Sequence, residues 1–117
     1  MISNPVSLGL ASLDESKGRL SRAFQGEAQG TFLSFETPAL LLKVLTGKRW
    51  EILRTMTGTG PLAIREIARR VGRDVKAVHG DVKALLAAGV LDRAEGRVLF
   101  PFDVVHVAFS LTAAAQR

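Results

Sequence analysis

The chain of 117 residues is 47% hydrophobic and 23% charged with a net charge of +5, which suits one globular domain and an acidic partner such as nucleic acid or an anionic membrane surface. It contains no cysteine, which excludes disulfides, thiolate metal sites and a cysteine nucleophile, and its two histidines are too few for a histidine-rich metal site. No apolar run approaches the roughly 18 residues of a membrane span, and the N-terminus lacks a signal-peptide pattern, so we expect a cytoplasmic protein with no cofactor, metal or membrane partner.

The first 36 residues predict an extension made of a strand, a helix and a second strand. Residues 4–9 (NPVSLG) are a weak strand candidate, because proline and glycine disfavour strands. Residues 12–24 fit a helix, and residues 31–35 (TFLSF) are rich in strand-favouring side chains. We expect this extension to contribute to a dimer interface.

Two helices are predicted next. Thr37 and Pro38 suit the N-cap and first turn of a short helix that ends near residue 45 and that we expect to be mostly buried. Thr46 suits the N-cap of a helix over residues 47–57. The large apolar residues of that helix fall on one side: Trp50, Leu53 and Met56.

The following helices are separated by a glycine. Residues 64–71 have apolar side chains at i, i+3, i+4 and i+7, and Gly72 suits the C-terminus of that helix. A further helix covers about residues 74–88, with Asp74 as a favoured N-cap and Gly89 at its end. Its apolar side consists of Val75, Val78, Val82, Leu85 and Leu86.

The C-terminal part predicts strands. A β-hairpin follows Gly89, with a tight turn at Glu95–Gly96. Residues 104–111 alternate between apolar and other side chains, which predicts a final strand, and residues 112–117 predict a frayed tail. We expect the strands at 31–35 and 104–111 to form a sheet with the N-terminal segment and to help build a homodimer.

This order of elements is the winged helix-turn-helix layout. We therefore predict an α+β, mainly helical fold, in which a winged helix-turn-helix carries an added small sheet from N- and C-terminal strands. The predicted organisation is an N-terminal extension over residues 1–36, a DNA-binding domain over 37–103, and a C-terminal strand and tail over 104–117.

The positive charge lies in the middle of the chain. Residues 43–97 hold 12 lysines and arginines against 6 acidic residues, an asymmetry typical of a nucleic-acid surface. With about 100° per residue, the side of the 74–88 helix opposite its aliphatic residues carries only cations and small residues. Such a face suits close approach to a DNA major groove.

The candidate DNA-binding residues follow from this arrangement. We expect the 74–88 helix and its start to read the major groove through Arg73, Lys76, Ala77, Gly80 and Lys83. Arg93 and Arg97 flank the hairpin turn and are candidates for contact with the DNA backbone or minor groove. The alternative is that they are solvated charges at the edge of the hairpin. Arg65 and Arg69 on the preceding helix are candidates for phosphate contact, and ordinary solvated charges are the alternative.

Three residues of the 74–88 helix carry separate expectations. Gly80 either leaves room for a base or sugar or is a tolerated helical glycine with no contact role. His79, on the border between the two faces, is expected to be half-buried and bonded to nearby backbone, with the reading of a DNA base as the alternative. Asp81 is expected to pair with a nearby arginine or lysine, because phosphate repels it. No catalytic pattern appears, so we expect no enzyme.

The segments LTGKRWEIL, GRDVKAVHGDVKAL and FPFD carry a resemblance that covers about residues 32–111. The chain resembles a group of prokaryotic predicted transcriptional regulators, winged helix-turn-helix proteins related to the multiple-antibiotic-resistance (MarR-like) regulators. The resemblance implies DNA binding, and because some members are encoded beside toxin-like proteins it also implies a possible antitoxin role. Ala63 stands where that group tends to have a serine cap, and Gly80 where a larger residue is usual.

The resulting expectation is a sequence-specific double-stranded DNA-binding regulator, a repressor or autoregulator that acts as a homodimer on a palindromic operator. One alternative is an antitoxin-type protein that neutralises a toxin-like partner. Another is an accessory subunit that binds nucleic acid without sequence preference.

Overall fold

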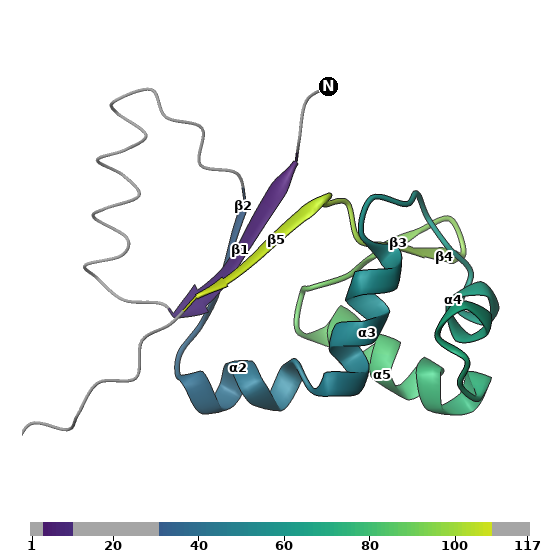
Figure 1. Ribbon diagram of the computed structural model, residues 1–117, viewed down its shortest axis with the longest axis horizontal. Coiled ribbons are helices and arrows are strands. Elements are labelled where there is room, and N and C mark those ends of the chain that lie inside the picture. The colour runs from purple at the N-terminus through teal and green to yellow at the C-terminus, as the bar shows by residue number, and fades with distance from the viewer. Residues whose placement is uncertain (1–3, 11–30, 109–117) are drawn as a thin grey trace, which may run out of the picture.

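The computed structural model describes residues 4–10 and 31–108. The expected helix over 12–24, the end of the expected strand over 104–111 and the tail over 112–117 lie outside them. The elements, in chain order, are β1 (Pro5–Leu10), β2 (Thr31–Phe35), α2 (Pro38–Val44), α3 (Gly47–Met56), α4 (Ile64–Val71), α5 (Val75–Ala87), β3 (Asp92–Ala94), β4 (Arg97–Leu99) and β5 (Val104–Ala108). The chain thus has the predicted α+β winged helix-turn-helix fold with a small added sheet (Figure 1).

Local sequence signals set the ends of the helices. The hydroxyl of Thr37 accepts a hydrogen bond from the Leu40 amide at 3.1 Å, and the carboxylate of Asp74 accepts one from the Lys76 amide at 3.0 Å. Gly72 ends α4 in the left-handed conformation with φ of 71°, which glycine adopts without a steric penalty. These three predicted ends are confirmed, as is the Thr46 cap of α3.

The wing is an antiparallel hairpin of β3 and β4. Glu95 and Gly96 both have positive φ, 51° and 79°, which is the type I′ turn that matches the twist of two paired strands. Leu62, before α4, forms a bridge to Val98 through hydrogen bonds of 2.9 and 2.8 Å. The wing is therefore attached to the segment that leads into α4 (Figure 1).

The added sheet has the strand order β2-β1-β5, and both pairings are parallel. The weak candidate at residues 4–9 is therefore the central strand. Pro5 is the first residue of β1, where proline is tolerated, and Gly9 permits a close approach: a Cβ there would lie 2.9 Å from the carbonyl oxygen of Ala108. The predicted sheet of both terminal regions is confirmed.

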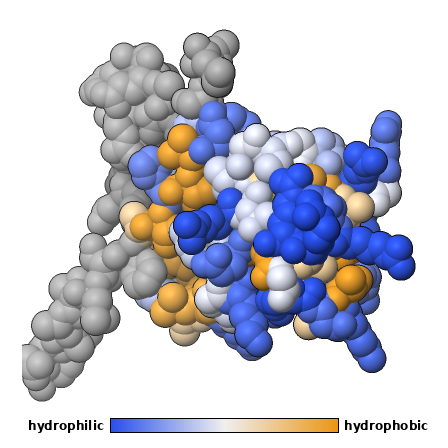
Figure 2. Space-filling model, turned by 45° about the vertical axis from the view of Figure 1, so that its right-hand side comes forward, coloured by the Kyte–Doolittle hydropathy of each residue, from blue (hydrophilic) through white to orange (hydrophobic). Residues whose placement is uncertain are grey.

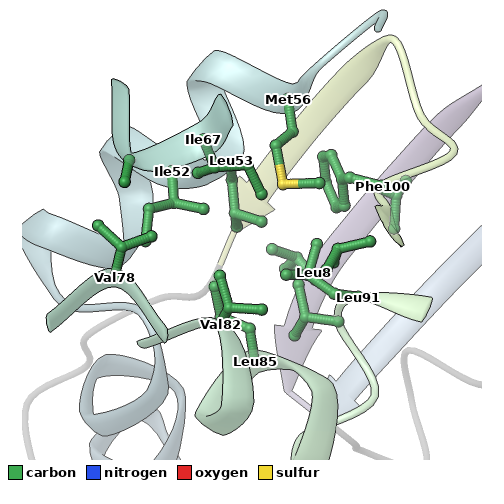
Figure 3. Close-up of a cluster of buried hydrophobic side chains, with 14 of the residues drawn as sticks. Leu8, Ile52, Leu53, Met56, Ile67, Val78, Val82, Leu85, Leu91 and Phe100 are labelled. Atoms are coloured by element: carbon green, nitrogen blue, oxygen red, sulfur yellow. The ribbon is translucent and has the colours of Figure 1, made fainter. Parts of the chain in front are cut away.

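A single buried cluster joins this sheet to the three helices of the winged domain (Figure 3). Val6 and Leu8 of β1 are buried together with residues of α3, α4, α5 and the wing, including Leu53, Ile67 and Leu85. Close packing of aliphatic side chains in one cluster resists relative movement of the layers. The sheet and the winged domain therefore share one core.

The expectation that α2 is mostly buried is wrong. Leu41 is the buried residue of α2, whereas Leu40 and Leu42 are 43% and 58% exposed, because α2 packs on β1 and β2 with one side only. Trp50 is 39% exposed although Leu53 and Met56 of the same helix are buried. The indole lines two open hollows between α3 and the sheet, one of which is also lined by Val105 and the other by Val107.

Candidate nucleic-acid interface

Helix α5 has two chemically distinct faces. Val78, Val82 and Leu85 are fully buried against the core, which sets how the helix is rotated about its axis. The opposite side is exposed, and it carries four of the predicted contact residues: Lys76, Ala77, Gly80 and Lys83. Lys76 and Lys83 form no ion pair within the part of the chain that the structure describes, so their charges are available to a ligand.

Gly80 lies in the middle of this exposed face. A Cβ built at this position would meet no atom within 4 Å, so the protein itself gives no steric reason for a glycine. A helical glycine is nevertheless less favourable than alanine by about 1 kcal/mol. The fold leaves the absence of a side chain here unexplained.

Arg97 on β4 directly follows the I′ turn, and Arg93 on β3 lies one residue before Ala94, with which the turn begins. Both are exposed, and neither forms an ion pair among residues 4–10 and 31–108. Figure 2 shows hydrophilic side chains over the end of the molecule that α4, α5 and the wing form. The wing therefore adds two cations to the same end as α5, and they lie on opposite faces of the hairpin because Arg93 is paired with Val98 and Arg97 with Ala94.

Helix α4 holds its arginines differently. Arg65 is exposed, while Arg69 and Arg70 donate to the carboxylate of Glu66 at distances of 2.5 and 2.7 Å. The hydrogen bonds from Arg69 and then Arg70 lower the pKa of Glu66 to about 2. Glu66 therefore stays ionised and neutralises part of the charge that α4 presents.

Arg73 is not free in the structure. Its guanidinium donates to Asp81 at 2.7 Å, and Arg49 of α3 donates to the other carboxylate oxygen of Asp81 at 3.0 Å. The predicted pairing of Asp81 is thus confirmed, with two partners. Burial raises the pKa of Asp81, but the hydrogen bonds from Arg73 and Arg49 outweigh it and leave that pKa below its usual value.

This network also reaches the end of α2. Arg49 donates to the carbonyl oxygens of Lys43 and Val44 at 3.3 and 3.2 Å. Asp81 and Arg49 therefore join α5 to α3 and to the end of α2. A major-groove role for Arg73 remains a prediction, and it requires the Arg73–Asp81 pair to open.

The expectation for His79 is wrong. Its side chain is exposed, because it lies beyond the edge of the stripe that Val78 and Val82 bury. It lines a small cleft together with Lys83 and Arg93. The spacing of His79, Lys83 and Leu86 at i, i+4 and i+7 indicates a common side of α5, but the position of Arg93 beside them follows only from the wing.

The described residues provide neither a metal site nor a membrane-spanning helix. Among residues 4–10 and 31–108, no group of three or more His, Asp or Glu side chains is placed to hold a metal ion. The helices of the same residues include none with the length and hydrophobicity of a membrane span.

An apolar area lies on the other side of the molecule, toward the sheet (Figure 2). Leu42, Trp50 and Val107 border a groove of about 360 Å³ between α2, α3 and β5. They are 58%, 39% and 40% exposed. Large apolar side chains gathered at one exposed place are typical of a surface that contacts another molecule.

A protein-family model matches residues 44–107, from the end of α2 into β5, which is more than half of the chain. The chain belongs to the HVO_A0114 family. The matched residues contain α3, α4, α5 and the wing, so the family region coincides with the winged helix-turn-helix.

A solved structure with a similar fold is the crystal structure of a predicted DNA-binding transcriptional regulator from E. coli. It has 21% sequence identity and a TM-score of 0.48, and the match covers 78% of this chain and 83% of that chain. No curated protein sequence matches the chain.

Proposed function

We propose that this member of the HVO_A0114 family is a double-stranded DNA-binding transcriptional regulator in the cytoplasm, related to the MarR-like regulators and without enzymatic activity. Its α5 enters the major groove, and its wing contacts the adjacent backbone or minor groove. A repressor or autoregulator that binds a palindromic operator as a homodimer is the form that we expect.

The observation that carries this proposal is the exposed face of α5. Lys76 and Lys83 are unpaired among the described residues, and between them lie Ala77 and Gly80, which project little beyond the backbone. Cations and small residues on one face allow a helix to lie deep in a groove while its charges meet phosphates or guanine edges. The buried residues on the opposite face keep this surface turned outward.

The dimer is proposed from the apolar side of the molecule. β5 is an edge strand in the sheet of the described residues, and the exposed Leu42, Trp50 and Val107 lie beside it. An unpaired strand edge next to exposed apolar side chains favours association with another chain. A two-fold dimer would place two α5 helices about one DNA turn apart on a palindromic site.

The proposal is tested by footprinting the purified protein on the DNA upstream of its own gene. A protected palindrome with an affinity at least about a thousandfold above that for random duplex is expected. Equal affinities and equal salt dependences on both duplexes would instead support the non-specific accessory subunit. Light scattering on the same sample is expected to give a dimer, and a strict monomer at micromolar concentration contradicts the assembly.

A second candidate function is favoured by the apolar groove itself. In an antitoxin-type protein, the groove beside Trp50 would bind a toxin-like partner while α5 remains free for DNA. Co-expression with the product of the neighbouring gene separates the two cases. If Trp50→Ser abolishes the complex while circular dichroism shows that the fold is retained, the result supports binding of the partner in the groove. If the partner co-purifies with Trp50→Ser as it does with wild type, the result contradicts a role for the groove.

A further inference from the structure

A small cleft lies between α5 and the wing, at the end of the molecule that the proposed function assigns to DNA. Its volume is about 170 Å³. Ile64, Val82 and Leu86 form its apolar lining, and the polar side chains in its wall are His79, Lys83 and Arg93.

The three polar side chains come from two elements and share one property. His79 and Lys83 lie one turn apart on α5, and Arg93 lies on β3. Each can donate hydrogen bonds, since an imidazole has an N–H group in both of its protonation states. No acidic residue lines the cleft, and none of the three has an ion-pair partner among the described residues. The cleft is therefore suited to an anion.

The position of the cleft selects the anion. In a winged domain the helix occupies the major groove and the wing lies beside it, so the DNA backbone runs between them. The wall of that passage is formed here by α5 and β3. An arginine matches the geometry of phosphate oxygens, and a lysine adds a point charge next to it.

We propose that His79, Lys83 and Arg93 form a binding site for one backbone phosphodiester of duplex DNA. This inference rests on the proposed function and assigns a position within it. Arg93 and Lys83 bind the two non-bridging oxygens, and His79 donates an N–H hydrogen bond to the same group. The apolar lining displaces water from the cleft, which strengthens these charge-assisted bonds. The site orients the wing relative to α5 on the DNA.

The test uses the full chain and measures the dissociation constant for a 30-base-pair duplex of random sequence, and for the footprinted duplex, at several KCl concentrations. Lys83→Met and Arg93→Gln are each expected to weaken binding about tenfold and to reduce the salt slope by about 1. Because both side chains act on one phosphodiester, the double variant is expected to lose little more than either single variant. Lys43→Met, an exposed lysine on α2, is the matched control for the loss of one charge.

Two outcomes overturn the shared site. The first is a double variant whose salt slope falls by about 2, because that result assigns the two cations to separate phosphates. The second is a Lys83→Met protein that binds no worse than Lys43→Met, because the effect is then one of net charge alone. His79→Leu is expected to weaken binding about threefold while His79→Gln, which keeps an N–H donor, restores most of it.

The failure of this inference is distinguishable from that of the proposed function. A wild-type protein that binds no duplex at low salt refutes both. Wild-type binding that the cleft variants leave unchanged refutes only the phosphodiester site. Inorganic phosphate, titrated in parallel and followed through the NMR signals of His79, is expected to bind far more weakly than duplex, and equal occupancy by free phosphate overturns the assignment to DNA. Thermal unfolding of every variant checks that the fold persists.

Discussion

Replacement of Gly80 by alanine separates the stability of α5 from its proposed contact with DNA. No atom lies within 4 Å of a Cβ at this position, and the residue is exposed within a helix of 13 residues. The new methyl group therefore meets no strain, and the helix gains the propensity difference of about 1 kcal/mol. For a chain of this size, that gain raises the melting temperature by about 4 °C.

The same change is expected to weaken DNA binding. If α5 lies in the groove with Gly80 against a base or sugar, the methyl group enters a packed interface, where an inserted carbon costs about 1–3 kcal/mol. The dissociation constant for the operator then rises by roughly 5- to 150-fold. Circular dichroism melting and fluorescence anisotropy measure the two effects on one sample. Gly47→Ala, at another helical glycine with open space around a Cβ, is the control and is expected to leave affinity unchanged.

Two results would refute the reasoning. A Gly80→Ala protein that is more stable and binds its operator as tightly as wild type shows that the glycine does not face the groove at close range. A protein that is less stable contradicts the open space that the structure gives to this position.

Three other substitutions and one pH series test the network and the elements that support the fold. Asp81→Asn is expected to lower the free energy of unfolding by about 1–3 kcal/mol. Because it releases Arg49 and Arg73, it is also expected to increase affinity for random duplex and to make the salt slope steeper by about 1–2, and a loss of both stability and random-duplex affinity contradicts this. The pKa of Asp81 is lower in the folded state than in the unfolded state. Ionised Asp81 therefore stabilises the fold above its unfolded-state pKa of about 4, and this stabilisation disappears as the pH falls through the lower folded-state pKa. Denaturant midpoints measured from pH 5 downward are expected to drop more for wild type than for Asp81→Asn. Ala63→Ser supplies the side-chain hydrogen bond that the N-cap of α4 lacks, at a residue whose backbone is already extended. It is expected to raise the free energy of unfolding, measured by urea titration, by about 1 kcal/mol, whereas the control Ala63→Val is expected to give no increase. Gly9→Ala forces a Cβ against the Ala108 carbonyl and is expected to destabilise the sheet, which a lower melting temperature would report and an unchanged one would contradict.

Local signals in the chain predicted the winged domain closely. The N-cap residues Thr37, Thr46 and Asp74 act on amides two or three residues ahead, and the positive φ values at Gly72 and Glu95–Gly96 arise within single turns. Such interactions depend on a few neighbouring residues, so they can be inferred without knowledge of the rest of the fold. The missing cap at Ala63 follows in the same way.

Exposure of the candidate-site residues was harder to infer. Trp50 shares a side of α3 with two buried residues but lies beyond the elements that bury them. In α2, three consecutive leucines point in different directions, and only Leu41 is buried because one side of the helix meets the sheet. His79 lies one position beyond a buried valine. A helical period gives the direction of a side chain, whereas its exposure depends on which other element is packed there.

The amino-acid sequence by itself determined where the helices begin and end, which side of α5 is aliphatic and where the wing turns, because these features arise from contacts within a few residues along the chain. The tertiary structure alone decided that β1 is the centre of a parallel sheet, that Asp81 holds both Arg49 and Arg73, and that Arg93 lies beside His79 and Lys83. These pairings join residues from separate elements, and only the packing of the common core brings them together.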